Sequence, residues 1–203
     1  SKNLIFKKMK KKIFEYFAHP IFKYKLENYS EHNKILRKYI HQLQQEDPKG
    51  QIKSNIGGWH SPFFDLNNQA GIGYKFLLTI QPYIVDVFKS YGWAYDPKKI
   101  YCSGMWAIIN KKENLNNEHI HPNSNLSAAY YVKAPENCGD FMVSNPHSIS
   151  RNMYPSRENP TELNRMVAKH KVEEGDLLIF PAYLPHQVLP NKSDEERIVI
   201  SFN

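Results

Sequence analysis

The chain has 203 residues, of which 41% are hydrophobic, so it is long enough for one globular domain with a substantial core. No apolar run approaches the roughly 20 residues that cross a bilayer, and no signal-peptide-like apolar segment follows the N-terminal lysines. These features argue against membrane and secreted classes, and we expect a cytoplasmic protein without membrane contact.

The cysteine content argues against a disulfide framework and against a structural zinc site. Cys102 and Cys138 are the only two cysteines, and their spacing forms no CxxC pair. This usage is typical of a reducing compartment. We expect two ordinary thiols.

The net charge of +7 is concentrated at one end of the chain. Residues 1–25 hold eight lysines and one acid, Glu15, whereas the remainder holds 19 basic and 19 acidic residues. We interpret residues 1–12 as a basic, solvated arm that precedes a single domain over residues 13–203. Phosphate binding by the arm is the alternative, and nucleic acid is not an expected partner because the domain itself is neutral.

Two helices are predicted in the N-terminal half. The aromatic segment before Leu26 is broken by Pro20, which favours an edge strand. Ser30 is a candidate N-cap for a helix whose apolar residues repeat at helical spacing until Asp47-Pro48. Residues 47–73 are interpreted as a loop. A second helix is predicted over 74–91, with Gly92 as its C-cap.

From Lys99 the pattern changes to short segments rich in β-branched and aromatic residues, separated by Pro, Gly and Asn. Six predicted strands follow one another without a helical period between them: KIYCSGMWAII, NLSAAYYVKA, GDFMVSN, RMVAKHKV, DLLIFP and RIVISFN. The sequence therefore predicts a mainly β fold, a sandwich or barrel, packed against the two N-terminal helices. A doubly wound sheet is disfavoured because strands and helices do not alternate.

Three histidines form a candidate metal site. His119 and His121 lie in EHIHPNSN, and residues i and i+2 of a strand share one face. His186, in FPAYLPHQV, follows a distant predicted strand and is placed to complete the site. Imidazole ligands suit iron, zinc, copper and nickel.

Arg197 is a candidate anion-binding residue on the last predicted strand. A buried guanidinium needs an anionic partner, with which it pairs bidentately when the partner is a carboxylate. If Arg197 is instead exposed, it pairs loosely with Asp194 or Glu195. Buried Arg197 would favour a small anionic ligand, because the sequence offers it no obvious acidic mate.

The order of these motifs, HxH, YYV, GDLLIFP, PHQV and RIVISFN, resembles the iron(II)- and 2-oxoglutarate-dependent oxygenases. The resemblance runs from about residue 19 to the last residue. It is strongest to a branch that carries an SNxGGWxS segment, here SNIGGWHS at 54–61. The PHQV segment followed by arginine also resembles, more distantly, prolyl hydroxylases.

The resemblance implies a double-stranded β-helix, which is a cupin-like jelly roll. It implies that His186 is the distal metal ligand, that Arg197 binds the far carboxylate of 2-oxoglutarate, and that the hydroxyl of Tyr131 lies beside that carboxylate. The implied reaction consumes O₂ and 2-oxoglutarate, releases succinate and CO₂, and hydroxylates a substrate C–H bond. Fe(II) and 2-oxoglutarate are the implied cofactors, with ascorbate as the reductant in vitro.

One motif departs from the family pattern. The superfamily usually has HxD or HxE at its first site, whereas this chain has His119-Ile120-His121. We favour His119, His121 and His186 as the ligands. A site with two histidine ligands is the second choice, since alignment on His121 places Asn123 at the carboxylate position. Glu118 is expected on the opposite strand face.

Substrate-side candidates are Trp106, Asn110 and Trp59, the last of these in a glycine-rich segment that is placed to cover a barrel mouth. Packing of both tryptophans in the core is the alternative. The other histidines, residues 19, 32, 41, 60, 147 and 170, are interpreted as structural or surface groups, although His60 lies in the same segment. The PHQV resemblance favours a peptidyl or prolyl substrate.

Two other classes of function stay open. The first is a cupin-like enzyme or metal-binding protein that uses three histidines without 2-oxoglutarate. The second is a non-catalytic nucleic-acid-associated module that uses the basic arm. The oligomeric state is not predicted.

Overall fold

The computed structural model describes residues 11–147, 152 and 155–203, so most of the predicted basic arm, residues 1–12, lies outside the described residues. The described chain contains eleven β-strands in two antiparallel sheets, and two helices, α1 and α2, precede most of them. No helix of the described part is both long enough and apolar enough to span a membrane.

The larger sheet has six strands and the smaller has five. In spatial order, the larger sheet consists of β1 (Phe22–Lys25), β9 (Asp176–Pro181), β6 (Leu126–Lys133), β11 (Arg197–Phe202), β4 (Met105–Asn110) and β3 (Trp59–His60). The smaller sheet consists of β2 (Asn55–Ile56), β5 (Leu115–His119), β10 (His186–Val188), β7 (Phe141–Ser144) and β8 (Val167–His170). Two facing antiparallel sheets with these crossovers form a jelly roll, which confirms the predicted fold class.

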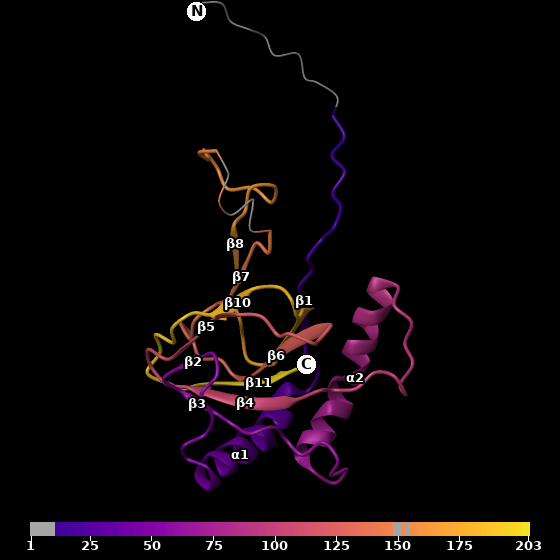
Figure 1. Ribbon diagram of the computed structural model, residues 1–203. Helices are drawn as coiled ribbons and strands as arrows, with labels where there is room; N and C mark the ends of the chain where they lie inside the picture. Colours follow the sequence, from indigo (N-terminus) through magenta and orange to yellow (C-terminus); the bar gives the residue numbers. More distant parts are fainter. Residues whose placement is uncertain (1–10, 148–151, 153–154) are drawn as a thin grey trace, which may run out of the picture.

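Helices α1 (Tyr29–Glu46) and α2 (Ile72–Tyr91) cover the outer face of the larger sheet (Figure 1). Both predicted helices are confirmed, as is Gly92, which ends α2 at φ 67° in the left-handed region. The predicted N-cap at Ser30 is wrong. The chain turns out of β1 through Asn28, which takes the left-handed conformation as the cap and places Ser30 inside the first helical turn.

Alternation along the strands divides the larger sheet into two apolar faces. On β11, Ile198 and Ile200 join the core under the helices, whereas Val199 joins the core between the two sheets. Arg197 is in phase with Val199, so the register sends its side chain into the interior of the jelly roll. Because both faces of the larger sheet are buried, the sequences of its strands are continuous apolar runs rather than alternating apolar and polar residues.

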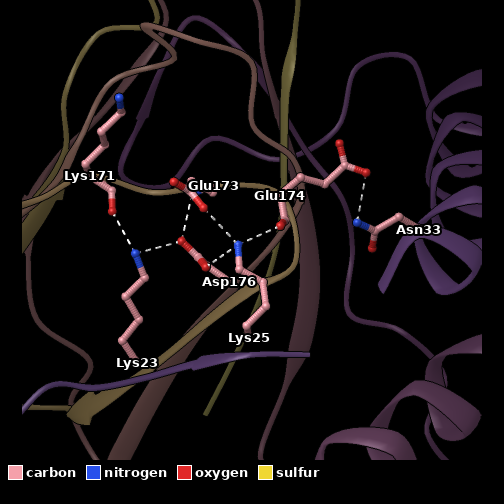
Figure 2. Close-up of polar contacts among 7 residues, drawn as sticks. All are labelled: Lys23, Lys25, Asn33, Lys171, Glu173, Glu174 and Asp176. Carbon is pink, nitrogen blue, oxygen red and sulfur yellow. Dashed lines mark hydrogen bonds and ion pairs between the residues drawn. The ribbon is translucent and has the colours of Figure 1, made fainter. Parts of the chain in front are cut away.

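The edge strand β1 is fixed to β9 by a carboxylate between two lysines (Figure 2). Asp176 is buried, and its two oxygens lie 2.9 Å from Nζ of Lys23 and 2.7 Å from Nζ of Lys25. Lys25 also donates to the carbonyl of Glu174, whose carboxylate accepts a hydrogen bond from Asn33 on α1. The turn just before β9, which contains Glu174, therefore contacts both β1 and α1 and holds them against the larger sheet.

Four short strands were not predicted, and two of them carry the candidate site. β5 and β10 pair with each other, with His119 opposite His186, while β2 and β3 lie in the segment interpreted as a loop. The residues of β5, LNNEH, lack the β-branched and aromatic side chains that mark strands. Pairing with β2 and β10, rather than local propensity, gives this segment its extended form.

Candidate metal centre and anion pocket

The three candidate histidines converge. His119 ends β5, His186 begins the neighbouring β10, and His121 lies in the turn just after β5. One ring nitrogen from each of the three lies within 4.8 Å of the other two. The ring centroids are 4.3 Å apart for His119 and His186, and 5.1 Å apart for His121 and His186. Among the described residues, only these three form such a group of potential ligands.

Hydrogen bonds set the tautomers of two of the rings. Nδ1 of His119 lies 2.7 Å from the carbonyl oxygen of Asn117, and Nδ1 of His186 lies 2.8 Å from that of Leu184. Because a carbonyl oxygen only accepts, both Nδ1 atoms carry the proton. The lone pairs are then on the Nε2 atoms, where a metal ion can use them.

The environment keeps the three imidazoles neutral at physiological pH. Burial lowers the pKa of His186 to about 3, with a further contribution from repulsion by His119. Burial likewise lowers the pKa of His121 to about 4, again with a contribution from His119, and it lowers the pKa of His119. Neutral imidazoles are the form that binds metal ions, so proton competition at this site is weak at pH 7.

The histidines line a cavity of about 810 Å³ in the interior of the jelly roll. Its walls are mostly apolar and aromatic, and Arg197 on β11 also lines it. Arg197 is 1% exposed. A pocket with apolar walls and a few buried polar groups is typical of a small-molecule site.

Arg197 has no carboxylate partner in the described protein. Its Nη1 donates to the carbonyls of Cys138 and Leu189, and its Nη2 is buried without a hydrogen-bond partner. The alternative of loose pairing is wrong, because Asp194 and Glu195 pair instead with lysines, 112 and 133 respectively. A buried guanidinium with no carboxylate partner and one nitrogen left unpaired calls for an anion.

Tyr131 carries a second unpaired polar group, in the neighbourhood of Arg197. It is fully buried on β6, and its hydroxyl has no hydrogen-bond partner in the part of the chain that the structure describes. Burial raises the pKa of Tyr131 well above the usual value for tyrosine, and the charge of Arg197 opposes this only in part. The hydroxyl therefore keeps its proton and can donate a hydrogen bond to an anion bound by Arg197.

The predicted substrate-side residues separate into different environments. Trp106 lines the cavity, with its ring stacked 5.7 Å from His60 and 5.7 Å from His121. Asn110 is buried and donates to the side chain of Asn116 at 3.0 Å. The structure does not bring Trp59 to the cavity, because alternation on β3 turns it into the core under the helices, where its Nε1 donates to Asp47.

Several cavity residues were missed from sequence, among them His60 and Glu118. His60, interpreted as structural or surface, lines the cavity and donates from Nδ1 to its neighbour Ser61. Glu118, expected on the opposite face from the histidines, also lines the cavity, and its carboxylate accepts a hydrogen bond from Ser144. The pairing register of β5 and β10 shifts next to Glu118, which breaks the strict alternation on which the expectation depended.

Residues 104–203 match a family model described as "Putative 2OG-Fe(II) oxygenase", where 2OG is 2-oxoglutarate. The match begins just before β4 and contains all three histidines, Tyr131 and Arg197. No curated protein sequence matches the chain significantly.

Solved structures with the same fold include a Pseudomonas putida prolyl-4-hydroxylase, at a TM-score of 0.63 and 12% identity over 91% of each chain. HygX from Streptomyces hygroscopicus, solved with nickel and 2-oxoglutarate, has a TM-score of 0.61 and 11% identity over 91% of this chain and 82% of its own. A viral collagen prolyl hydroxylase from Paramecium Bursaria Chlorella virus-1, solved with 2OG, has a TM-score of 0.58 and 15% identity over 90% and 93%. At these identities the similarity establishes the fold.

Proposed function

We propose that the chain is a 2OG-Fe(II) dioxygenase that hydroxylates a substrate C–H bond, because residues 104–203 match the model of that oxygenase family. His119, His121 and His186 would hold Fe(II), and Arg197 with Tyr131 would hold the distal carboxylate of 2-oxoglutarate. When bound, iron and 2-oxoglutarate together supply O₂ activation and C–H hydroxylation, with release of succinate and CO₂.

The unpaired state of Arg197 is the observation that carries this proposal. Nη2 of Arg197 is a buried donor without an acceptor among the described residues, and Arg197 lines the cavity that also contains the three histidines. The hydroxyl of Tyr131, near enough for the charge of Arg197 to act on its pKa, is a second buried donor without an acceptor. Leaving a charged donor unpaired in the interior costs several kcal/mol. A dicarboxylate that reaches from the histidines to Arg197 would satisfy both donors.

The charges are consistent with this arrangement. Three neutral imidazoles leave the +2 charge of iron unbalanced by the protein, since the usual carboxylate ligand is replaced by His121. 2-Oxoglutarate carries two negative charges, one for the metal end and one for Arg197. The apolar residues of the cavity, such as Phe141, Phe180 and Val199, exclude water and strengthen both interactions.

A peptidyl or prolyl substrate is the first to test. Similar folds occur in a prolyl-4-hydroxylase and in a viral collagen prolyl hydroxylase. The fold also occurs in HygX, which has been solved with hygromycin B bound, so a small molecule is the second class to test. Proline-containing peptides and small-molecule panels would be screened by mass spectrometry for the gain of one oxygen atom.

The three-histidine set also suits a metal enzyme that does not use 2-oxoglutarate. Such a protein would have no use for a buried arginine with an unpaired Nη2 in the cavity of the histidines. The two functions are separated by titration of the metal-loaded protein with 2-oxoglutarate, with succinate, which lacks the keto group, as the comparison ligand.

His186→Ala should abolish metal binding and turnover. It removes one of two ligands whose tautomers are fixed by the backbone. The measurements are calorimetric titration with Fe(II) under anaerobic conditions, and succinate formation from 2-oxoglutarate with Fe(II), ascorbate and O₂. His32→Ala, on α1, is the matched control and should leave both unchanged. Iron-loaded protein that neither binds nor consumes 2-oxoglutarate would contradict the proposed function.

A further inference from the structure

His121 is held differently from the other two histidines. His119 and His186 each donate Nδ1–H to the carbonyl of the residue two positions earlier, so the backbone fixes their tautomers. Nδ1 of His121 instead lies 3.1 Å from the side-chain nitrogen of Asn203. An amide side chain can present either a donor or an acceptor, whereas a carbonyl cannot.

The backbone of Asn203 is anchored independently of its side chain. Its N–H donates to the carbonyl of Gly104 at 3.0 Å, and its carbonyl accepts from the N–H of Ser103 at 2.9 Å. The side chain lies in the wall of the metal cavity, where Oδ1 accepts a hydrogen bond from the hydroxyl of Ser127 at 2.8 Å. Substitution of the side chain therefore leaves the backbone bonds of this segment in place.

The direction of the amide determines which nitrogen of His121 can bind a metal ion. With Nδ2 of Asn203 as the donor, Nδ1 of His121 is the acceptor, so the proton of the neutral ring is on Nε2. In this state Nε2 has no lone pair to offer. A half-turn of the amide places Oδ1 against a protonated Nδ1 and frees the lone pair of Nε2.

Ser127 permits this half-turn without leaving a polar group unpaired. Its hydroxyl donates to Oδ1 of Asn203 in the present arrangement. After the half-turn it would accept a hydrogen bond from Nδ2, because a hydroxyl both donates and accepts. Both orientations of the amide keep the three groups, Ser127, Asn203 and His121, hydrogen-bonded.

We propose that Asn203 is a positioning residue whose amide orientation decides whether His121 offers Nε2 to the metal ion. The inference rests on the proposed function and deepens it. The usual carboxylate ligand of the superfamily needs no tautomer to be selected, whereas a histidine at that place does. Asn203, paired with Ser127, would supply this selection from the residue that follows β11.

Nitrogen NMR of the histidine rings tests the proposal directly. In metal-free protein at neutral pH, His119 and His186 should show the Nδ1–H tautomer and His121 the Nε2–H tautomer. Addition of Zn(II) should convert His121 to a protonated Nδ1 with Nε2 bound to metal. Persistence of the same His121 tautomer in both states, or metal bound through its Nδ1, would overturn the proposal.

Two substitutions give the matching affinity test. Asn203→Asp offers only acceptors to Nδ1–H, so His121 should adopt the Nδ1–H tautomer before metal is added, and Zn(II) should bind more tightly. Asn203→Leu removes the partner and should weaken Zn(II) binding by roughly 10- to 100-fold, the usual effect of losing a partner behind a metal ligand. Asn125→Leu changes an exposed amide in the segment between β5 and β6 that also contains His121, and it should change neither property.

The outcomes also separate this inference from the proposed function. If Asn203→Leu binds Zn(II) as tightly as the wild type or more tightly, the role of Asn203 is wrong while the metal site stands. If the wild-type protein binds Zn(II) but the nitrogen NMR signals of His119, His121 and His186 do not change, in the wild type or in the variants, the proposed function itself fails.

Discussion

At the scale of single residues, removal of the Tyr131 hydroxyl should affect stability and 2-oxoglutarate binding in opposite directions. It is buried without a hydrogen-bond partner, so the folded protein gains nothing from it in the absence of a ligand. Tyr131→Phe should therefore leave the free energy of unfolding unchanged or raise it by about 1 kcal/mol. The same change should weaken 2-oxoglutarate binding by roughly 5- to 30-fold, since one hydrogen bond to a carboxylate is lost.

The adjacent Tyr130 provides the matched control. It lies on the opposite face of β6, and its hydroxyl donates to the side chain of Asn33 at 2.7 Å. Tyr130→Phe should lower the free energy of unfolding by about 1 kcal/mol and leave 2-oxoglutarate affinity unchanged. Urea unfolding and calorimetric titration measure the two quantities. Equal effects of both substitutions on 2-oxoglutarate binding would show that Tyr131 does not contact the co-substrate.

The sequence was most informative where a residue type is rarely buried without a reason. Arg197 on an apolar strand pointed to an anion, and its burial without an acidic partner agrees with that interpretation. The direction of each side chain was harder to predict. Trp59 and His60 are neighbours in the same short segment, yet alternation sends Trp59 into the helix-side core and His60 into the cavity. Only the pairing of β3 with β4 determines which of the two faces the site.

At the scale of elements, the buried carboxylate of Asp176 holds the edge strand β1 in place. Its side chain is 1% exposed, while the paired Lys23 and Lys25 are 42% and 43% exposed. Asp176→Asn keeps the side-chain volume but removes the charge that both lysines contact. We expect a loss of about 1–3 kcal/mol in the free energy of unfolding, because the lysines can still turn to water. Hydrogen exchange of the β1 amides should become faster.

Asp194 provides the comparison for this effect. It also pairs with a lysine, Lys112, at 2.6 Å, but its side chain is 89% exposed. Asp194→Asn should leave the urea midpoint unchanged, because water screens an exposed pair. Equal destabilisation by the two substitutions would mean that burial of Asp176 does not determine the strength of its ion pairs.

The long elements were predictable from sequence and the short ones were not. The helices α1 and α2 carry a helical apolar period, and β6, β9 and β11 are continuous apolar runs, so each can be recognised on its own. β5 and β10 have five and three residues, and most residues of their sequences, LNNEH and HQV, line the cavity. Their extended form depends on partners distant in sequence, so local patterns contain little of that information.

At the scale of the whole molecule, the candidate site is built from both sheets of the jelly roll. His119 and His186 come from the smaller sheet, and Tyr131 and Arg197 come from the larger one. The helices α1 and α2 lie on the outer face of the larger sheet (Figure 1). They contribute no residue to the cavity wall. A ligand that joins the histidines to Arg197 would therefore connect the two sheets through the interior.

The basic arm is expected to be separable from this chemistry. Residues 1–12 contain six lysines, and residues 11 and 12, the part that the structure describes, are exposed and absent from the cavity wall. Deletion of residues 1–12 should leave Fe(II) binding, 2-oxoglutarate binding and succinate formation at wild-type levels. Any affinity of the protein for nucleic acid should disappear, since the remaining chain is close to neutral. Substitution of the six lysines by glutamine in the full-length protein should reproduce both results, because the affinity for nucleic acid would depend on the charge of the arm alone. Loss of succinate formation in the deleted protein, with iron still bound, would instead make the arm part of the active enzyme.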